Sequence, residues 1–398
     1  MKIVLLNNDF RAYWKGRLLY LRQFLAAKGT GFYAIELFGK DSPYSFDRYD
    51  NTESWWNCLF PTQHSNELKS NEIKKALFHL LDEIEPDIII GPSIVFYAGA
   101  LGLNWAKKHK KKFIMFDDAR PGQVKRNEFI QGIKNLLIKQ SDGLWFPSEE
   151  YADDYSYLDN GEMHFFFGFN AVDNQLFRPR EEKDQGNKTI VCVARLVPVK
   201  NIHTLLKAWQ LIEEKHTGYR LLIIGTGPEM ERLKELSKEL KLQMIQFEGA
   251  VDNRDLPAYY HRSEVFILPS LSESWGLVVN EAMASGLPVL LSNHVNASRS
   301  LLKEGRNGFS FDPRSVKNMK ETILNYIHLP LDVKQSMAAH SLRIIESLSY
   351  EKMGMQLLEA IEKIRSSKYK KAEILASVIL SRWHGRYNTA GWDREGKM

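Results

Sequence analysis

The stretch EVFILPSLSESWGLVVNEAMASGLPVLL, residues 264–291, decides the fold. Val265 to Leu268 is a short apolar run, which is typical of a buried strand. Residues 270–274 are polar and predict a loop. From about Gly276 the apolar spacing becomes helical, and Gly286 is suited to end that helix before the next apolar run. A strand, a loop, a helix and a second strand predict a βαβ unit. Its loop opens at the carboxyl end of a strand, where open α/β sheets bind ligands.

Two carboxylates mark this unit, Glu273 in the loop and Glu281 in the helix. An ionised carboxylate only accepts hydrogen bonds and can take two hydroxyl donors at once, as the vicinal diol of a sugar or ribose presents them. The amides of Trp275, Gly276 and Leu277 lie at the predicted helix N-terminus, which favours an anion. Acids near a helix start also offset the helix dipole, so the pair alone indicates no more than a helix-end detail.

The whole string from Glu273 to Val289, with its trailing Glu-Ala-Met-Ala-Ser-Gly-Leu-Pro-Val, resembles the E-x7-E signature of the retaining glycosyltransferases of family 4. The resemblance covers about residues 165–350 and is looser elsewhere. It implies the GT-B architecture: two Rossmann-like, doubly wound α/β domains facing each other across a cleft, with C-terminal helices crossing back to the first domain. It also implies transfer with retention of anomeric configuration.

The rest of the chain alternates strands and helices in two halves, which predicts parallel sheets with right-handed crossovers. Residues 41–65 are aromatic and irregular in pattern and predict no element. We expect an acceptor-side domain at 1–168, a linker at 169–188, a donor-binding domain at 189–348 and C-terminal helices and tail at 349–398 packing back on the first domain.

Arg195 and Lys200 follow the strand predicted at Thr189–Ala194. Two cations at the carboxyl end of a parallel strand can clamp a diphosphate and stabilise the charge that develops on it. Spacing alone favours two solvated loop cations. The string ARLVPVK, however, resembles the phosphate-binding motif of family 4, and it precedes the Glu pair at the distance found there.

Three further donor contacts are expected from resemblance. Gly225 begins a Gly-x-Gly turn, a weak signal because tight βα turns need glycine with or without a ligand. Phe247 ends another strand, near backbone that would meet the nucleotide base. Gly16 stands alone where many relatives carry a glycine pair facing the donor phosphate, with Arg11 and nearby cations around it.

On the acceptor side, Asp117, Asp118 and Arg120 follow a strand where relatives often place a histidine. Either aspartate could orient an acceptor hydroxyl, and Arg120 or Lys125 could meet an acceptor phosphate. The Asp-Asp pair could equally cap the next turn.

Composition narrows the class of protein. Net charge is +5, too small an excess to indicate nucleic acid binding, though it would help contact with anionic lipid. The only cysteines, Cys58 and Cys192, exclude a disulfide framework and favour a reducing cytoplasm. No Asp-x-Asp motif and no His/Cys cluster has metal-ligand spacing, so we expect no metal and no cofactor beyond the nucleotide sugar itself. His294 lies near the predicted site and is flagged.

The run Ala106–Lys112, AKKHKKK, ends a predicted helix, where cations suit the dipole; contact with a membrane is the sharper alternative. The segment Tyr369–Trp383 places apolar residues on one helical face beside lysines. We expect it to pack on the first domain, with a lipid-facing tail as the second interpretation.

The sequence therefore predicts a metal-independent, retaining glycosyltransferase with a nucleotide diphosphate sugar as donor. A glycan or lipid-linked oligosaccharide for a cell-surface polysaccharide is the preferred acceptor class, with a cytoplasmic location that includes the inner face of the plasma membrane. The alternatives are a nucleotide-sugar epimerase on the same architecture and a non-catalytic sugar-binding protein. Loss of one of the four charged residues, Arg195, Lys200, Glu273 and Glu281, would mark the latter, and all four are present.

Overall fold

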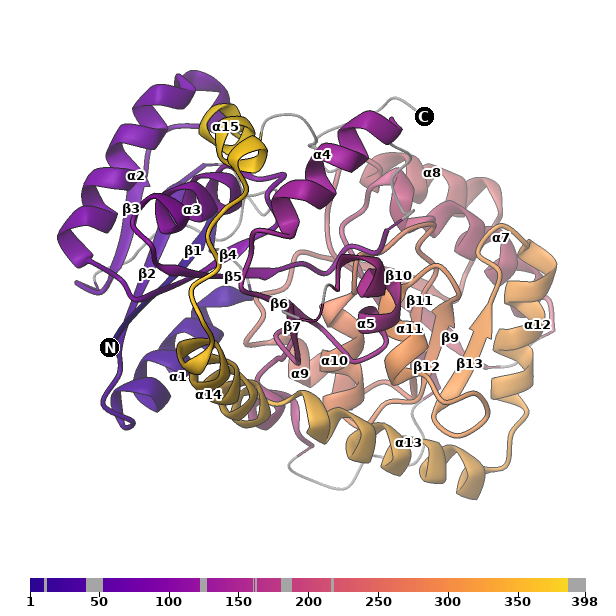
Figure 1. Cartoon of the computed structure of the whole chain (residues 1–398). Helices are drawn as coiled ribbons and strands as arrows, with labels where there is room; N and C mark the ends of the chain where they lie inside the picture. The colour runs from indigo at the N-terminus through magenta and orange to yellow at the C-terminus, as the bar shows by residue number, and fades with distance from the viewer. Residues whose placement is uncertain are drawn as a thin grey trace. The chain divides into compact units, whose positions relative to one another are not determined.

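The computed structural model describes residues 1–10, 13–40, 53–121, 127–159, 161, 163–179, 188–215 and 218–385. The chain forms two compact units, one made of residues 1–169 and 350–398 and the other of residues 170–349. Each unit is built around one parallel sheet with helices packed against it (Figure 1).

The sheet of the first unit has seven strands in the order β3-β2-β1-β4-β5-β6-β7, all paired in parallel. Its centre is buried on both faces, which requires nearly continuous apolar strands such as IVLL in β1 and III in β4. The strands are β1 Lys2–Asn7, β2 Gly31–Phe38, β3 Trp56–Phe60, β4 Ile88–Pro92, β5 Lys112–Phe116, β6 Gly143–Phe146 and β7 His164–Phe167.

The helices of the first unit include two from the C-terminal part of the chain. They are α1 Trp14–Ala26, α2 Ser70–Ile84, α3 Tyr97–Lys108, α4 Glu128–Ile138, α5 Tyr151–Tyr155, α14 Tyr350–Ser366 and α15 Ile374–Arg382, with short 3-10 helices at Ser65–Glu67 and Ser156–Leu158. Helix α14 packs against α1 and β7, and α15 packs against α3 and α4 (Figure 1). The prediction that the C-terminal helices return to the first domain is confirmed.

The second unit has six parallel strands in the order β10-β9-β8-β11-β12-β13. They are β8 Thr189–Val193, β9 Arg220–Ile224, β10 Ile245–Gly249, β11 Val265–Leu268, β12 Val289–Ser292 and β13 Gly308–Phe311. The helices are α6 Asn174–Phe177, α7 Ile202–Glu213, α8 Met230–Glu239, α9 Leu256–His261, α10 Leu277–Ala284, α11 Asn296–Leu301, α12 Val316–Ile327 and α13 Leu331–Ile345, with 3-10 helices at Pro198–Lys200 and Glu346–Leu348.

Both sheets are doubly wound, as predicted. Their strand order reverses between β1 and β4 in the first unit and between β8 and β11 in the second. At such a switch point two neighbouring loops leave the sheet in opposite directions and open a crevice at the carboxyl ends of the strands, where ligands bind.

Three strands were not predicted. The expectation that residues 41–65 are irregular is wrong at β3, and neither β7 nor β13 was identified, although residues 41–52 lie outside the described part. All three are edge strands of their sheets. An edge strand is partly exposed, so its apolar pattern is shorter and weaker than that of a central strand.

Candidate functional site

In the second unit, the switch point brings together the loop after β8 and the loop after β11, which carry Arg195 and Glu273. Asn201 joins the two loops from a left-handed conformation, φ 58°. Its side-chain amide donates to the carbonyl oxygens of Pro269, at 3.1 Å, and Pro313, at 2.8 Å. The amide of Leu271 also donates to the carbonyl of Val199, at 2.8 Å. The two loops therefore form one continuous hydrogen-bonded surface.

On this surface the Lys200 ammonium forms an ion pair with the Glu273 carboxylate. The two side chains are only 18% and 9% exposed, so water screens the pair less than it would on an open surface. The Ser270 hydroxyl lies 3.4 Å from the same carboxylate oxygen and donates to it. Arg195, which lies in the same loop after β8 as Lys200, is partly exposed. The sequence placed Lys200 and Glu273 at one sheet edge, and the structure brings their charged groups into contact.

The backbone of Glu273 is fixed from its other side by the segment after β12. Its amide donates to the carbonyl of His294, at 3.3 Å, and its carbonyl accepts from the amide of Asn296, at 3.2 Å. The His294 ring approaches through Nδ1, which lies 2.9 Å from the carbonyl oxygen of Leu271. A carbonyl oxygen can only accept, so Nδ1 carries the proton in this contact. His294 thus borders the loop it was flagged for and helps to shape it.

Helix α10 begins at Leu277 after Gly276, whose φ of 97° suits glycine. The indole nitrogen of Trp275 donates to the side-chain oxygen of Asn280, at 2.9 Å, and the Asn280 amide donates to the carbonyl of Asn170, at 2.9 Å. All three residues are buried. The Trp275 side chain is therefore committed to the interior, and an anion at this helix start would meet backbone amides.

Glu281 lies on α10 and is fully buried. Its Oε2 accepts a hydrogen bond of 2.9 Å from the hydroxyl of Tyr260 on α9. Sequence reasoning missed Tyr260, because its spacing from Glu281 has no meaning until α9 and α10 are placed side by side in space. The second carboxylate of the signature is thus less accessible here than the first.

Gly225 and Gly227 form the turn after β9. A Cβ on Gly225 would come 2.0 Å from the carbonyl oxygen of Ala194, and one on Gly227 would come 2.3 Å from that of Leu196. The Leu196 amide donates to the carbonyl of Thr226, at 2.8 Å. Close approach to the cation-bearing loop is therefore a sufficient reason for both glycines. Phe247 lies in β10 and is partly exposed.

In the first unit, Gly16 is in the first turn of α1, and a Cβ there would lie 2.4 Å from the hydroxyl oxygen of Tyr350. The next residue, Arg17, is buried, and its guanidinium carbon lies 5.0 Å from the Trp14 ring centroid. Burial lowers the pKa of the Arg17 guanidinium to about 10, against the opposing effects of Tyr350 and Asp118. Arg17 is thus a buried cation near a predicted acceptor-side aspartate; Arg11 lies outside the described residues.

The predicted acceptor-side residues are held within the first unit. The Asp117 carboxylate accepts from the amide of Ala119, at 3.0 Å, so it caps its own turn. Arg120 is buried, forms an ion pair with Asp154 and stacks on the Tyr151 ring, 4.1 Å from its centroid. The Tyr151 hydroxyl donates to the carbonyl of Asp118. These contacts give the segment a structural role, and Lys125 lies outside the described residues.

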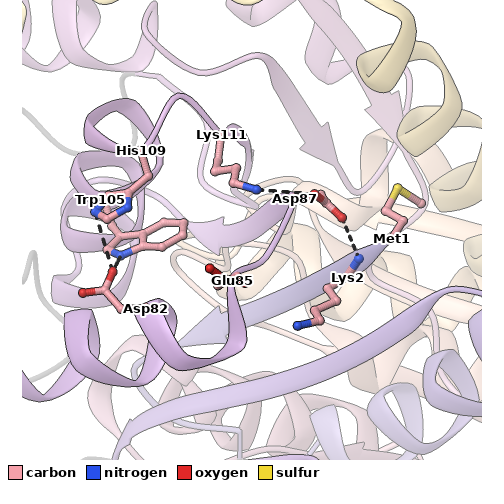
Figure 2. Close-up of a pocket in the computed structure, with 8 residues that line it drawn as sticks. All are labelled: Met1, Lys2, Asp82, Glu85, Asp87, Trp105, His109 and Lys111. Carbon is pink, nitrogen blue, oxygen red and sulfur yellow. Dashed lines mark hydrogen bonds and ion pairs between the residues drawn. The ribbon is translucent and has the colours of Figure 1, made fainter.

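A pocket of about 580 Å³ lies elsewhere in the first unit (Figure 2). It is at the amino ends of β1, β4 and β5, opposite the edge where such sheets bind ligands. Its polar groups largely satisfy one another: Asp82 accepts from the Trp105 indole at 2.7 Å, and Asp87 accepts from the Lys2 amide at 2.8 Å and pairs with Lys111 at 3.4 Å. We assign no function to it.

Among the described residues, no group of three or more His, Cys, Asp and Glu side chains is arranged to hold a metal ion. No helix in the described ranges has the length and apolar character needed to cross a membrane.

Comparison with known proteins finds a family model that matches most of the second unit. Residues 173–342 match the model of the family described as glycosyl transferases group 1. An uncharacterized glycosyltransferase of Haemophilus influenzae is 37% identical over 134 residues, which are 33% of this chain and 37% of that protein. A GDP-mannose-dependent alpha-(1-6)-phosphatidylinositol monomannoside mannosyltransferase of Mycobacterium tuberculosis is 31% identical over 170 residues, 38% of this chain and 44% of that protein. The chain thus matches less than half the length of these two relatives.

Solved structures resemble the chain over most of its length. Sucrose-phosphate synthase from Thermosynechococcus elongatus superposes with a TM-score of 0.72 at 18% identity, covering 92% of this chain and all of that one. HepE from Anabaena, in complex with UDP, gives a TM-score of 0.71 at 14% identity, covering 91% of this chain and all of that one. At these identities the likeness shows the fold alone, two Rossmann-like domains of the GT-B type.

Proposed function

We propose that the protein is a retaining glycosyltransferase of family 4 that moves a sugar from a nucleotide diphosphate sugar to an acceptor hydroxyl. The observation that carries this proposal is the Lys200–Glu273 ion pair at the switch point of the second unit, inside the segment that matches the glycosyl transferases group 1 family. HepE, a protein of the same fold, was solved with UDP and with UDP and glucose, which supports a nucleotide sugar as donor.

In this proposal the donor exchanges partners with the ion pair. The diphosphate takes the Lys200 ammonium and the Arg195 guanidinium, and the freed Glu273 carboxylate accepts from hydroxyls of the sugar. The amides of Trp275, Gly276 and Leu277 add to the anion site. Glu281 accepts from the ribose diol, with Gly225 and Phe247 along the nucleotide. After the exchange the cations are paired with phosphate and the Glu273 carboxylate accepts hydrogen bonds, so binding leaves no buried charge without a partner.

The reaction is a front-face displacement. The acceptor oxygen attacks the anomeric carbon from the side on which the sugar–phosphate bond breaks, and the departing phosphate oxygen takes the acceptor proton. Negative charge grows on the diphosphate as that bond breaks, and Arg195 and Lys200 stabilise it more strongly in the transition state than in the ground state. These two cations supply in the mechanism what a metal ion supplies in other transferases, so we propose a metal-independent reaction.

We further propose a glycan or lipid-linked oligosaccharide as acceptor, in the synthesis of a cell-surface polysaccharide, with the protein at the cytoplasmic face of the membrane. The similarity to a mannosyltransferase whose name specifies a phosphatidylinositol mannoside supports a lipid-linked acceptor. Asp117, Asp118, Arg120 and Gly16 of the first unit are proposed on the acceptor and phosphate side.

The test has two steps. Thermal shift with uridine, guanosine and adenosine diphosphates identifies the base, and the matching nucleotide sugars are then assayed for transfer. Lys200→Met, Arg195→Met and Glu273→Gln should each lower kcat by about 10²- to 10³-fold, the loss typical of a group that stabilises developing charge.

Matched controls stand at the opposite edge of the same sheet. Lys188 and Arg220 are exposed cations at the amino ends of β8 and β9, so Lys188→Met and Arg220→Met should keep full turnover. Full turnover in the Arg195 or Glu273 variants would overturn the proposed site. Conversion of the donor sugar into its epimer without any acceptor would instead identify an epimerase.

A further inference from the structure

Helix α15 is fixed on the first unit by one of its faces. Ala376 and Leu380 are buried, and the Leu380 carbonyl accepts from the Asn104 side chain of α3, at 3.0 Å. Just beyond the helix, the indole of buried Trp383 donates to the carbonyl of Ile94, at 2.7 Å. The helix thus has a defined inner face and a defined orientation (Figure 1).

The opposite face of α15 carries three large apolar side chains in the open. Ile374, Leu375 and Val378 are 85%, 63% and 52% exposed, and their i, i+1, i+4 spacing puts them on one side of the helix. A single exposed leucine needs no explanation, but a contiguous apolar group on a helix that is otherwise well packed indicates a contact surface. We call these three residues the α15 outer face.

The surroundings of the α15 outer face are basic. Residues 368–382 contain Lys368, Lys371 and Arg382, together with Lys370, whose ammonium is buried, against one carboxylate, Glu373. Lys371 and Arg382 are exposed at the two ends of the helix, and the Lys74 ammonium of α2 lies 3.4 Å from the Ser381 carbonyl. An apolar stripe flanked by cations complements a bilayer interface that carries anionic head groups.

In the basic run Ala106–Lys112, Lys108 and Lys110 are exposed, whereas Lys107 and Lys112 make internal contacts. The Lys107 ammonium pairs with buried Asp142, at 3.1 Å, and the Lys112 ammonium donates to the Lys368 carbonyl, at 2.7 Å. The Tyr369 hydroxyl donates to the Lys107 carbonyl, at 3.1 Å. The run therefore anchors the segment that leads into α15, so that the outer face is presented on a firmly attached helix.

We propose that the α15 outer face lies in the interface of an anionic lipid bilayer, with Ile374, Leu375 and Val378 among the upper acyl chains and the flanking cations at the head groups. The choice of a bilayer over a protein partner rests on the proposed function, in which a lipid-linked acceptor must be met at a membrane surface.

The experiment is co-sedimentation of the full chain with large unilamellar vesicles, either of phosphatidylcholine alone or with about one-third phosphatidylglycerol. The wild type should bind the anionic vesicles. The affinity of the variant Ile374→Ser/Leu375→Ser/Val378→Ser for these vesicles should be lower by about tenfold or more. Each lost side chain removes part of the free energy of transfer into the bilayer. Lys371→Glu/Arg382→Glu should weaken binding to anionic vesicles and reduce its dependence on salt.

The matched control is a variant with three exposed apolar residues of the second unit replaced, Leu211→Ser/Met244→Ser/Leu331→Ser. This variant should bind vesicles as the wild type does. The three α15 substitutions are at exposed positions, and an unchanged melting temperature will establish that the fold is intact. Absence of wild-type binding, or equal binding by the α15 and control variants, would overturn the proposal. Self-association without vesicles that the α15 variant abolishes would overturn it too, by identifying a contact between copies of the chain.

The proposed catalytic function is tested by a separate measurement. Affinity for the nucleoside diphosphate, followed by thermal shift without vesicles, should be the same in the α15 variant and the wild type. If vesicle binding is absent while Glu273→Gln lowers kcat as expected, only the bilayer inference is overturned. If vesicle binding is as expected while Glu273→Gln retains turnover, only the proposed function falls.

Discussion

Each carboxylate of the candidate site is held by a side chain from another element: Glu273 by Lys200, and Glu281 by Tyr260. A buried carboxylate is costly unless hydrogen bonds compensate the loss of water. Tyr260 is therefore a positioning residue for Glu281, and its removal tests that role.

We expect Tyr260→Phe to lower the free energy of unfolding by about 1–3 kcal/mol, because Glu281 loses a hydrogen bond in a buried environment. It should also weaken binding of the nucleoside diphosphate, which isothermal titration calorimetry will measure. The hydroxyl of the neighbouring Tyr259 donates a hydrogen bond of 2.7 Å to Glu248 Oε1. Tyr259→Phe is the control and should change the free energy of unfolding by less than about 0.5 kcal/mol; equal effects in both variants would remove Tyr260 from the site.

Cys192 lies in the central strand β8 and is fully buried. Burial raises the pKa of its thiol to about 12, although nearby Lys200 favours the thiolate. Since the thiolate is the reactive form, Cys192 should resist iodoacetamide at pH 8 in the native protein and react after unfolding in urea. Intact-mass spectrometry will count the labels, and rapid native labelling at Cys192 would contradict the burial described here.

Among the elements, the turn after β9 has little room for a larger residue. Gly225 has φ 130°, and an added Cβ would meet the Ala194 carbonyl at 2.0 Å, so the loop that carries Arg195 would have to move. The turn and the cation-bearing loop are thus one packed assembly.

Gly225→Ala should destabilise the protein by about 3 kcal/mol or more, since it combines backbone strain with a clash. Gly305 has φ 71° and nothing within 4 Å of the added Cβ. Gly305→Ala therefore measures the strain of the left-handed conformation alone, about 1–2 kcal/mol. Thermal unfolding of both variants gives the difference, and a Gly225 variant no less stable than the Gly305 variant would show that the two loops are not packed as described.

At the scale of the whole molecule, three histidines of the described part link folding to pH. Burial lowers the pKa of His164, His203 and His384 in the folded state, and nearby lysines add to the effect in each case. The unfolded chain then binds protons at a higher pH than the folded one does.

The contribution of these histidines to the free energy of unfolding is therefore fully present above about pH 6.5. It is lost as the pH falls below that value, through the lowered pKa values of the folded state. We expect the melting temperature to fall between pH 7.5 and pH 5.5. A variant with all three replaced by glutamine should show a smaller fall than the wild type. An equal fall in both proteins would assign the pH dependence to other groups.

Much of this architecture could be predicted from local pattern. The central strands, such as β8 and β11, are apolar over their whole length because they are covered on both faces, and the turns after them carry the glycines and polar residues that mark a βα unit. The same pattern identified Glu273 and Lys200 as neighbours, because the carboxyl ends of parallel strands meet at one edge. The edge strands β3, β7 and β13 were not predicted, because partial exposure weakens their apolar pattern.

Partnerships between side chains were decided in three dimensions. Nothing local to Tyr260 indicates that it binds Glu281, and nothing near Lys107 indicates that its charge turns inward to Asp142 and not outward to lipid. Such contacts depend on how the helices pack across a sheet. That packing results from many weak side-chain preferences distributed over the whole chain. The amino-acid order thus defined which chemistry stands at the strand ends, and packing alone defined which of those groups are buried, paired or left facing solvent.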